Sequence, residues 1–283
     1  MKKLKILITG ASGFVGSSLA KALADHELYL LVHRKEFGLG ENFLEHDLAE
    51  ELDREKLPKS LDIIIHQAAL VGRKQTNPAE LLKINVEGTR KLLEYGKDVG
   101  LKKFAFASSV AVYGPKQDLA KESERLNPQN LYAESKVAAE ELVSFYSNHF
   151  ETLIFRYNDP YGAGMRHGLV FHLLNNMEPG RKVEFFNGGE NPKANPIYID
   201  DLVEATKKSL ELGGSHTINL GGPETKTPKE IVESLVKITG KKPEFEYIED
   251  KNKGNQIVDT ALMEKLLIKP KIGIEEGLKR FVA

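Results

Sequence analysis

Short apolar runs alternate with longer amphipathic patterns through the first half of the chain. Runs of about four or five residues rich in Ile, Leu, Val and Phe are typical of buried strands. The amphipathic patterns predict helices over Phe14–Ala24, Pro78–Val99 and Leu131–His149. This alternation indicates a parallel sheet with right-handed crossovers, and hence an α/β fold of the doubly wound Rossmann type. The predicted strands are Lys5–Ile8, Leu28–Val32, Asp62–His66, Lys103–Ala107 and Thr152–Phe155.

The pattern becomes mixed after Arg156. Loops rich in Gly, Asn and Pro fill residues 158–168 and 187–196, and no internal repeat is present. We therefore expect a dinucleotide-binding domain over residues 1–157 and a smaller, interleaved C-terminal substrate-binding lobe over 158–283. Some segments of the second range are expected to return to the first domain. Helices are predicted there at Asp200–Leu212, Pro228–Thr239 and Glu275–Phe281.

A glycine-rich segment follows the first predicted strand. Residues 9–16 read TGASGFVG and lead into a helical pattern. Gly10 permits a tight turn, Gly13 lets the backbone approach a pyrophosphate, and Gly16 lets the helix pack close to the sheet. The helix N-terminus offers unpaired N–H groups to phosphates. The spacing G-x-x-G-x-x-G differs from the general dinucleotide fingerprint, so an ordinary strand–helix turn remains the alternative.

A second motif lies about 120 residues later. Tyr132 and Lys136 are four residues apart, so a helix places them on one face. An ammonium about 4 Å from a phenol favours the phenolate by roughly 4 kcal/mol, or about three pKa units, which suits the tyrosine for proton transfer. Ser109 could hydrogen-bond the substrate oxygen. An exposed Tyr and Lys on a solvated helix is the alternative, but the two motifs together favour a redox enzyme.

Composition excludes several other classes of function. The 283 residues carry 40 basic and 41 acidic side chains, a net charge of −1, so no nucleic-acid partner is indicated. The absence of cysteine excludes disulfides, thiolate catalysis and Cys-type zinc sites, and we predict no metal. The apolar run near the start is too short for a signal peptide, and no run reaches about 18 residues, so no membrane segment is predicted. We expect a cytoplasmic protein.

Several ordered motifs resemble the extended short-chain dehydrogenase/reductase family, the group of NAD(P)-dependent nucleotide-sugar epimerases and dehydratases. The resemblance covers nearly the whole chain. Its stretches are Thr9–Gly16, His46–Leu48, Asp62–Ala69, Asn85–Thr89, Ser108–Gly114, Tyr132–Lys136, Arg156–Gly162, Ile197–Asp201, Ile218–Pro223 and Lys269–Leu278.

The resemblance implies a role for individual positions. Ser109, Tyr132 and Lys136 match the catalytic residues, and Lys136 also matches a residue that holds the nicotinamide ribose. It further implies a homodimer through the helices near Pro78–Val99 and Leu131–His149. The implied cofactor-binding residues are Gly10, Ser12, Gly13, Phe14, Val15 and Gly16 in the turn, Asp47 and Leu48 at the adenine, Ala68 and Ala69 beside the phosphates, and Pro160 beside the nicotinamide amide. Tight packing at a strand end is an alternative reason for the two alanines.

The end of the second strand bears on the choice of cofactor. NAD-binding domains usually place an acidic residue there for the ribose 2′-OH. Here the sequence continues with His33, Arg34 and Lys35, and the first acid is Glu36. Because Arg34 can bind a 2′-phosphate bidentately, we predict NADP as the favoured cofactor, with NAD as the alternative.

The positions after Ser109 narrow the reaction. The family's 4,6-dehydratases carry an Asp-Glu pair where this chain has Val110 and Ala111. The sugar decarboxylases would need Glu at Ala111, and the 3,5-epimerase/reductases would need Cys there. Chemistry that requires only Ser, Tyr and Lys remains, which means a nucleotide-sugar 4-epimerase or a ketoreductase.

The substrate side departs from the family's pattern. Asp159 stands where the family has Asn, Ala194 stands where it has Arg, and residues 252–255 lack the Arg of a C-terminal R-x-G-D segment. Diphosphates are normally bound by Arg, so an NADP-dependent reductase of a non-nucleotide carbonyl compound is the second hypothesis. A non-catalytic, dinucleotide-sensing protein is the third. Lys193, Lys253, Arg166 and Arg181 are the cations that could compensate.

Overall fold

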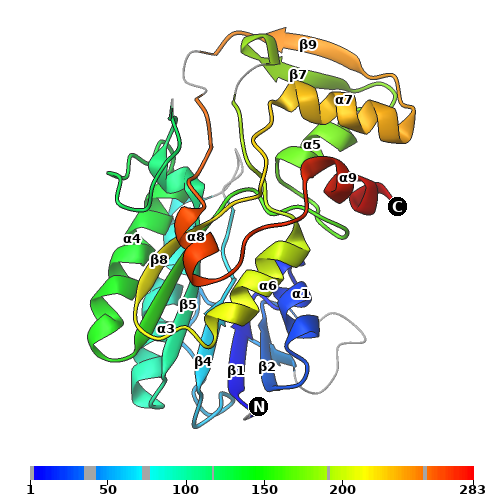
Figure 1. Ribbon diagram of the computed structural model, residues 1–283. Coiled ribbons are helices and arrows are strands. Elements are labelled where there is room, and N and C mark those ends of the chain that lie inside the picture. The colour runs from blue at the N-terminus through cyan, green and yellow to red at the C-terminus, as the bar shows by residue number, and fades with distance from the viewer. Residues whose placement is uncertain (1–2, 35–42, 72–76, 117, 190–191, 251–253) are drawn as a thin grey trace. The chain divides into compact units, whose positions relative to one another are not determined.

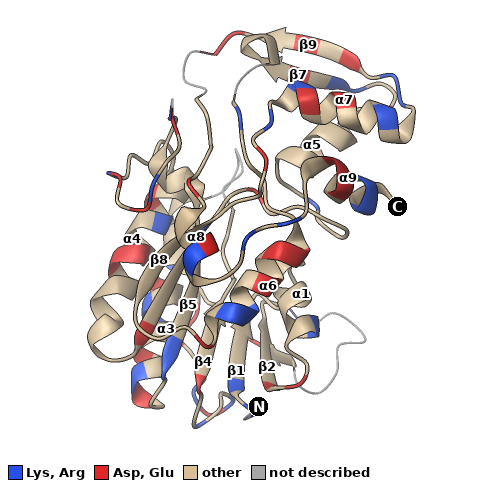
Figure 2. Ribbon diagram, in the orientation of Figure 1, with Lys and Arg blue, Asp and Glu red and all other residues tan. Residues whose placement is uncertain are grey.

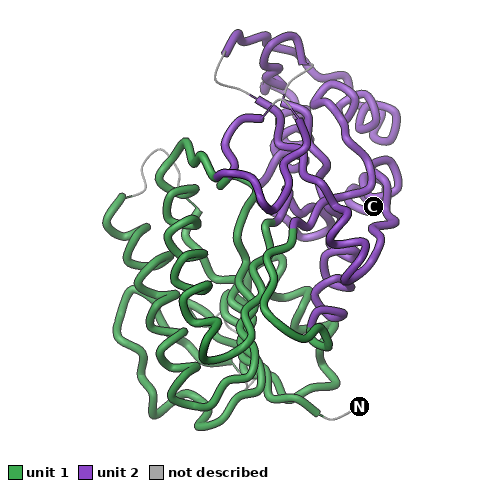
Figure 3. Tube along the Cα trace, turned by 60° about the vertical axis from the view of Figure 1, so that its left-hand side comes forward, with its two compact units in different colours: residues 1–112, 126–156, 210–218 green, residues 113–125, 157–209, 219–283 purple. Residues whose placement is uncertain are grey.

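The computed structural model describes residues 3–34, 43–71, 77–116, 118–189, 192–250 and 254–283. The chain forms two compact units (Figure 3). Unit 1 comprises residues 1–112, 126–156 and 210–218, and unit 2 comprises 113–125, 157–209 and 219–283. Segment 210–218 thus returns to the first unit, whereas segment 113–125 belongs to the second.

A seven-stranded sheet forms the centre of unit 1 (Figure 1). Its strand order is β3-β2-β1-β4-β5-β6-β8. The pairings of β1 with β2 and β4 are parallel, and Leu7 lies between Tyr29 and Ile64. The predicted Rossmann-type, doubly wound sheet is therefore confirmed. The strands are β1 (Lys5–Thr9), β2 (Glu27–Val32), β3 (Phe43–Glu45), β4 (Ile63–His66), β5 (Lys103–Ser109), β6 (Glu151–Tyr157) and β8 (His216–Leu220).

The helices of unit 1 follow the amphipathic patterns with one interruption. The range Pro78–Val99, predicted as one helix, is divided by a π-helical turn. Asn77 caps the first part by accepting a hydrogen bond from the Ala79 N–H. The helix predicted over Leu131–His149 ends at Phe145 and continues as a 3₁₀ turn, Tyr146–Asn148. The elements are α1 (Phe14–Ala22), α2 (Pro78–Leu82), the π turn (Lys83–Glu87), α3 (Gly88–Asp98) and α4 (Leu131–Phe145).

The core of unit 1 lies between the sheet and the neighbouring helices α3 and α4 (Figure 1). Leu7, Ile64 and Phe104 pack there with Leu92 of α3 and Val143 of α4. The alternate strand residues are buried as well, because both faces of a parallel sheet are covered. Charged residues of unit 1 follow its helices and the ends of its strands (Figure 2). Because the charged residues lie outside the middle of the strands, runs of apolar residues were enough to predict the strands.

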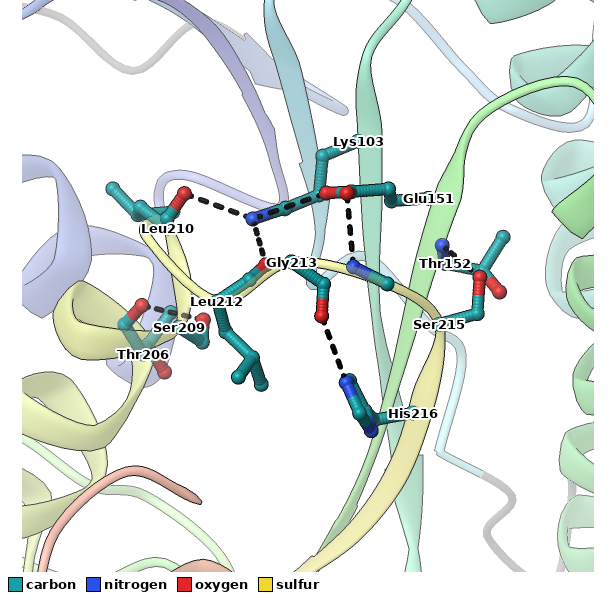
Figure 4. Close-up of polar contacts among 11 residues, drawn as sticks. Lys103, Glu151, Thr152, Thr206, Ser209, Leu210, Leu212, Gly213, Ser215 and His216 are labelled. Atoms are coloured by element: carbon teal, nitrogen blue, oxygen red, sulfur yellow. Dashed lines mark hydrogen bonds and ion pairs between the residues drawn. The ribbon is translucent and has the colours of Figure 1, made fainter.

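Lys103, the first residue of β5, is charged and yet buried (Figure 4). Its ammonium donates hydrogen bonds to the carbonyls of Leu210 and Leu212, at 2.8 and 2.6 Å, and lies 3.5 Å from the Glu151 carboxylate. Burial lowers the pKa of Lys103, and Glu151 raises it. These contacts attach segment 210–218 to the sheet.

Unit 2 is built around buried asparagines and a small sheet. Asn195 accepts a hydrogen bond from the Val258 N–H and donates to its carbonyl, and Asn158 donates to the carbonyl of Gln256. These bonds join segments that are far apart in sequence. A two-stranded parallel sheet pairs β7 with β9. The elements are α5 (Leu169–Asn175), β7 (Lys182–Phe186), α6 (Ile199–Ser209), α7 (Pro228–Thr239), β9 (Glu244–Ile248), α8 (Ala261–Leu266) and α9 (Ile274–Val282).

The described residues contain neither a membrane-spanning helix nor a cluster of metal ligands. None of the helices in the described ranges is long and apolar enough to cross a bilayer. Among the same residues, no three or more His, Asp or Glu side chains are grouped so that they could hold a metal ion.

Candidate active site

In the glycine-rich turn of unit 1, three glycines lie close to backbone atoms of neighbouring residues. Gly10 has a φ of 66°, and a Cβ there would lie 2.8 Å from the Ala68 nitrogen. A Cβ on Gly16 would lie 2.2 Å from the Gly10 carbonyl oxygen, and one on Gly13 would lie 3.2 Å from it. Both the conformation of Gly10 and the packing of Gly16 therefore require glycine.

The start of α1 is open to a ligand. Gly13 is its N-cap, so the cap has no side chain, and the first turn contains no acidic residue. Ser12 and Gly13 are exposed, and Phe14 and Val15 are half-buried. The backbone N–H groups of this turn are therefore uncapped by a side chain, which suits the binding of a phosphate. The residues present fit a dinucleotide pyrophosphate.

A buried hydrogen-bond chain holds the glycine turn against the end of β4. The Ala68 N–H donates to Thr9 Oγ1 at 3.1 Å, and Thr9 Oγ1 lies 2.6 Å from His66 Nδ1. On the other side of the ring, His66 Nε2 lies 3.0 Å from Thr89 Oγ1, which donates to the Asn85 carbonyl. Because Thr89 already donates, His66 must carry its proton on Nε2 and accept from Thr9. Burial lowers the pKa of His66 to about 3, so the ring stays neutral.

Asn85 in the π turn connects this chain to α4. Its side chain exchanges two hydrogen bonds with the backbone of Leu70, at 2.7 and 3.0 Å, and donates to Ser135 Oγ at 3.0 Å. Ser135 in turn donates to the Tyr132 carbonyl. The π turn thus positions both the segment after Ala69 and the start of α4. Sequence reasoning assigned no role to Asn85, His66 or Thr9, although all three lie in stretches that carry the family resemblance.

Ser109, Tyr132 and Lys136 lie together at the end of β5 and the start of α4. The Tyr132 hydroxyl hydrogen-bonds Ser109, and Ser109 Oγ also accepts from the Ala111 N–H at 3.2 Å. The Lys136 ammonium donates to the Ala107 carbonyl at 2.7 Å and lies 5.8 Å from the centre of the Tyr132 ring. The structure therefore brings together the three residues that the sequence singled out.

Electrostatics at Tyr132 differ from the expectation. Burial raises the pKa of Tyr132, and the hydrogen bond with Ser109 lowers it only in part. Burial also lowers the pKa of Lys136 to about 7, while the Glu140 carboxylate raises it. The expected lowering of the Tyr132 pKa by a fully charged Lys136 is not found, because both side chains are desolvated and Lys136 holds its proton weakly.

The loop after β3 carries the two residues expected at the adenine. The Asp47 carboxylate accepts from the Ala49 N–H at 2.8 Å and lies 3.4 Å from His33 Nε2. The buried Lys91 of α3 donates to the carbonyl of Leu48 at 2.8 Å, so the loop is fixed to that helix. Arg34 is exposed at the end of β2, and Lys35 and Glu36 lie outside the described residues.

Two other expected features lie after β5 and β6. Val110 and Ala111 follow Ser109 in a 3₁₀ turn, and neither of them carries a carboxylate. Pro160 belongs to unit 2, whereas the other expected site residues belong to unit 1.

Asp159 is half-buried in unit 2 and has a φ of 38°. Its carboxylate accepts a hydrogen bond from the Leu169 N–H at 2.9 Å. Burial raises the pKa of Asp159 to about 6, and backbone donors at the start of α5 partly oppose this. The carboxylate therefore binds the backbone of the first turn of α5.

Of the expected compensating cations, Lys193 lies in a hollow of mixed charge. Lys193 lines a hollow of about 400 Å³, which also contains Lys229 and Glu230. Mixed charge of this kind does not select an anion. Ala194 pairs through its backbone with Lys226. Lys253 lies outside the described residues.

The chain matches the model of a family described as the NAD dependent epimerase/dehydratase family over residues 6–221. A UDP-glucuronate 4-epimerase from Thermodesulfobacterium geofontis is 33% identical over 234 residues, which cover 79% of this chain and 72% of the relative. The structure of UDP-glucuronic acid 4-epimerase from Bacillus cereus, in complex with UDP-glucuronic acid and NAD, is 27% identical, with a TM-score of 0.87 and 98% coverage of both chains. UDP-glucose 4-epimerase from Thermus thermophilus, in complex with NAD, is 25% identical, with a TM-score of 0.86 over 99% of this chain and 98% of that one.

Proposed function

Because the chain belongs to the NAD dependent epimerase/dehydratase family, we propose that it is a cytoplasmic, NAD-dependent nucleotide-sugar 4-epimerase. The observation that carries this proposal is the grouping of Ser109, Tyr132 and Lys136 beside two positions that hold no acid. An enzyme that only moves one hydride and one proton needs no further acid–base pair.

The proposed mechanism assigns one task to each side chain. Bound dinucleotide supplies the hydride acceptor and donor. Tyr132 takes the proton from the sugar 4-hydroxyl and later returns it to the oxygen. Ser109 donates a hydrogen bond that orients this oxygen, and Lys136 holds the ribose while placing a cation near the phenol. Gly10 and Gly16 allow the tight turn and its packing, and Gly13 leaves the start of α1 open to the pyrophosphate.

A uridine diphosphate sugar is the proposed substrate class. The support comes from the relatives, two of which were solved with NAD and one of those also with UDP-glucuronic acid. The purified chain would be incubated with UDP-glucuronate, UDP-glucose and UDP-N-acetylglucosamine, and the products would be identified by NMR. We expect the C4 epimer of at least one of the three.

NAD is the proposed cofactor, because the related epimerase structures contain it. The preference for NADP drawn from Arg34 has no support from these relatives and stays a prediction. If it holds, Arg34→Ala should weaken NADP binding about ten- to hundredfold and leave NAD binding unchanged, because a charge-assisted contact to the 2′-phosphate is lost. Fluorescence titration with both dinucleotides measures this, with the exposed Arg125→Ala as a control. Equal ratios of affinity in wild type and Arg34→Ala would refute the preference.

An NADP-dependent reductase of a non-nucleotide carbonyl compound is the second candidate. It is favoured by Asp159 and Ala194, which replace the Asn and Arg expected at a diphosphate. The two functions differ in how the cofactor is used. An epimerase regenerates its dinucleotide in each cycle and often retains it, whereas a reductase must release the oxidised form. The absorbance of dinucleotide that is retained during purification, or consumed during turnover, therefore distinguishes them.

A homodimer is also proposed, through the helices near Pro78–Val99 and Leu131–His149. Phe145 at the end of α4 is 71% exposed, and Leu82 of α2 is 40% exposed, although both are large and apolar. Phe145→Glu should dissociate the dimer, because a carboxylate would be buried in the interface. Light scattering at micromolar concentration measures the mass, with the exposed Leu119→Glu as the control. A wild-type particle of 31.6 kDa would contradict the proposal.

A further inference from the structure

Glu140 is a buried carboxylate that the proposed Ser-Tyr-Lys chemistry does not use. It lies on α4, four residues after Lys136 and eight after Tyr132, so all three share one face of the helix. Its residue exposure is only 5%. A charge at this depth is costly unless it is paired and hydrogen-bonded, so its partners need to be identified.

The partners of Glu140 come from two neighbouring strands. The Arg156 guanidinium of β6 donates from Nε to Oε1 at 3.0 Å and from a terminal nitrogen to Oε2 at 2.7 Å. Ser108 of β5 donates its hydroxyl to Oε1. Ser108 lies between Ala107, whose carbonyl accepts from Lys136, and Ser109. Glu140 therefore fixes the end of β5 against the face of α4 that carries Tyr132 and Lys136.

Side chains from α4, β5 and β4 face Lys136. Tyr132 and Glu140 face it from its own helix, the Phe106 ring lies 4.8 Å from its Nζ on β5, and His66 faces it from β4. His66 is neutral, because burial lowers its pKa to about 3. Beyond Glu140, Arg156 of β6 is a permanent cation. Among these groups Glu140 is the carboxylate that opposes the loss of the Lys136 proton, and its charge raises the pKa of Lys136 against the effect of burial.

We propose that Glu140 is a positioning residue for the Tyr132–Lys136 pair, whose carboxylate, held by Arg156 and Ser108, favours the cationic form of the buried Lys136 side chain. Only the catalytic consequence rests on the proposed function. Without the carboxylate, no charge would oppose the effect of burial on Lys136. Lys136 would then lose its proton at a lower pH, and the positive charge on the helix face that carries Tyr132 would be lost with it.

The protonation of Lys136 can be measured without any substrate. The chain would be labelled with ¹³C-lysine, and the Cε signal of Lys136 would be assigned by its loss in Lys136→Arg. We expect a wild-type titration midpoint near pH 7, and a midpoint lower by about one unit or more in Glu140→Gln. Glu141→Gln, an exposed position on the same helix, should leave the midpoint unchanged. An unchanged midpoint in a folded Glu140→Gln chain would overturn the proposal.

Glu140→Asp separates the charge of residue 140 from its packing. It keeps the carboxylate and should retain most of the wild-type midpoint, although it disturbs the packing as a folding defect would. A Glu140→Asp midpoint as low as that of Glu140→Gln would also contradict the proposal.

The catalytic consequence is read from the pH dependence of kcat with NAD and UDP-glucuronate, or whichever UDP-sugar proves active. In Glu140→Gln, the alkaline limb of the profile should move to lower pH by the same amount as the NMR midpoint. A merely structural defect would lower kcat about equally at every pH. If wild type turns over no UDP-sugar, the proposed function fails, whereas the NMR result still decides the role of Glu140.

Discussion

Replacing Tyr132 with Phe is expected to lower kcat by about 10²–10⁴-fold, the usual contribution of a positioned acid–base group. The affinity for dinucleotide should stay nearly unchanged. The substitution removes only the hydroxyl that hydrogen-bonds Ser109, and the ring keeps its packing. Steady-state kinetics and a fluorescence titration of the same preparation would separate the two effects.

Two other variants should be measured beside Tyr132→Phe. Tyr247→Phe removes a hydroxyl from a residue that is 65% exposed and should have no effect. Ser109→Ala should lower kcat by less than Tyr132→Phe, because it removes one orienting hydrogen bond and leaves the proton donor. Retention of most of the turnover by Tyr132→Phe would contradict the mechanism, whatever the substrate.

Replacing Lys136 with Met is expected to damage both steps. Methionine fills the buried space without a charge, so the phenol loses its nearby cation and kcat should fall by about 100-fold or more. The ammonium, which now donates to the Ala107 carbonyl, would also be unavailable to the ribose. Loss of a hydrogen bond from a charged group should weaken dinucleotide binding about ten- to hundredfold.

The two losses in Lys136→Met have separate readouts. Lys97→Met on α3 is a matched control, because Lys97 is exposed. If the affinity for dinucleotide is unchanged, Lys136 does not contact the ribose, and only its role in proton transfer stands. If kcat is unchanged, Lys136 has no role in proton transfer, and only the ribose contact stands.

The strands of the central sheet were predictable because they are buried on both faces. An apolar run such as Ile63–His66 is buried along its whole length, so its composition identifies it as a strand of the interior. The short β3, the strand β8 and the pair β7 and β9 were not predicted. In β9, glutamates alternate with Phe245 and Tyr247, which are 43% and 65% exposed, so no apolar run marks the strand. The π turn was also missed, because its i→i+5 bonds leave no mark on an amphipathic pattern.

The candidate site was predictable where backbone geometry limits the residue type. Gly10 and Gly16 were identified on steric grounds, and the contacts of their missing Cβ atoms agree with this. The raised pKa of Tyr132 was not predictable, because the sequence does not show that the phenol is buried or that burial lowers the pKa of Lys136. Glu140 was missed because its partners Ser108 and Arg156 become neighbours only when the sheet forms.

The most direct test of the proposed activity uses a UDP-sugar that carries deuterium at C4. The chain would be incubated with NAD and deuterated UDP-glucuronate or UDP-glucose, and the products would be followed by NMR and the nicotinamide absorbance. A 4-epimerase predicts formation of the C4 epimer with deuterium retained at C4 and no net change in reduced dinucleotide. Absence of any epimer, together with stoichiometric consumption of NADPH on a carbonyl compound, would contradict it.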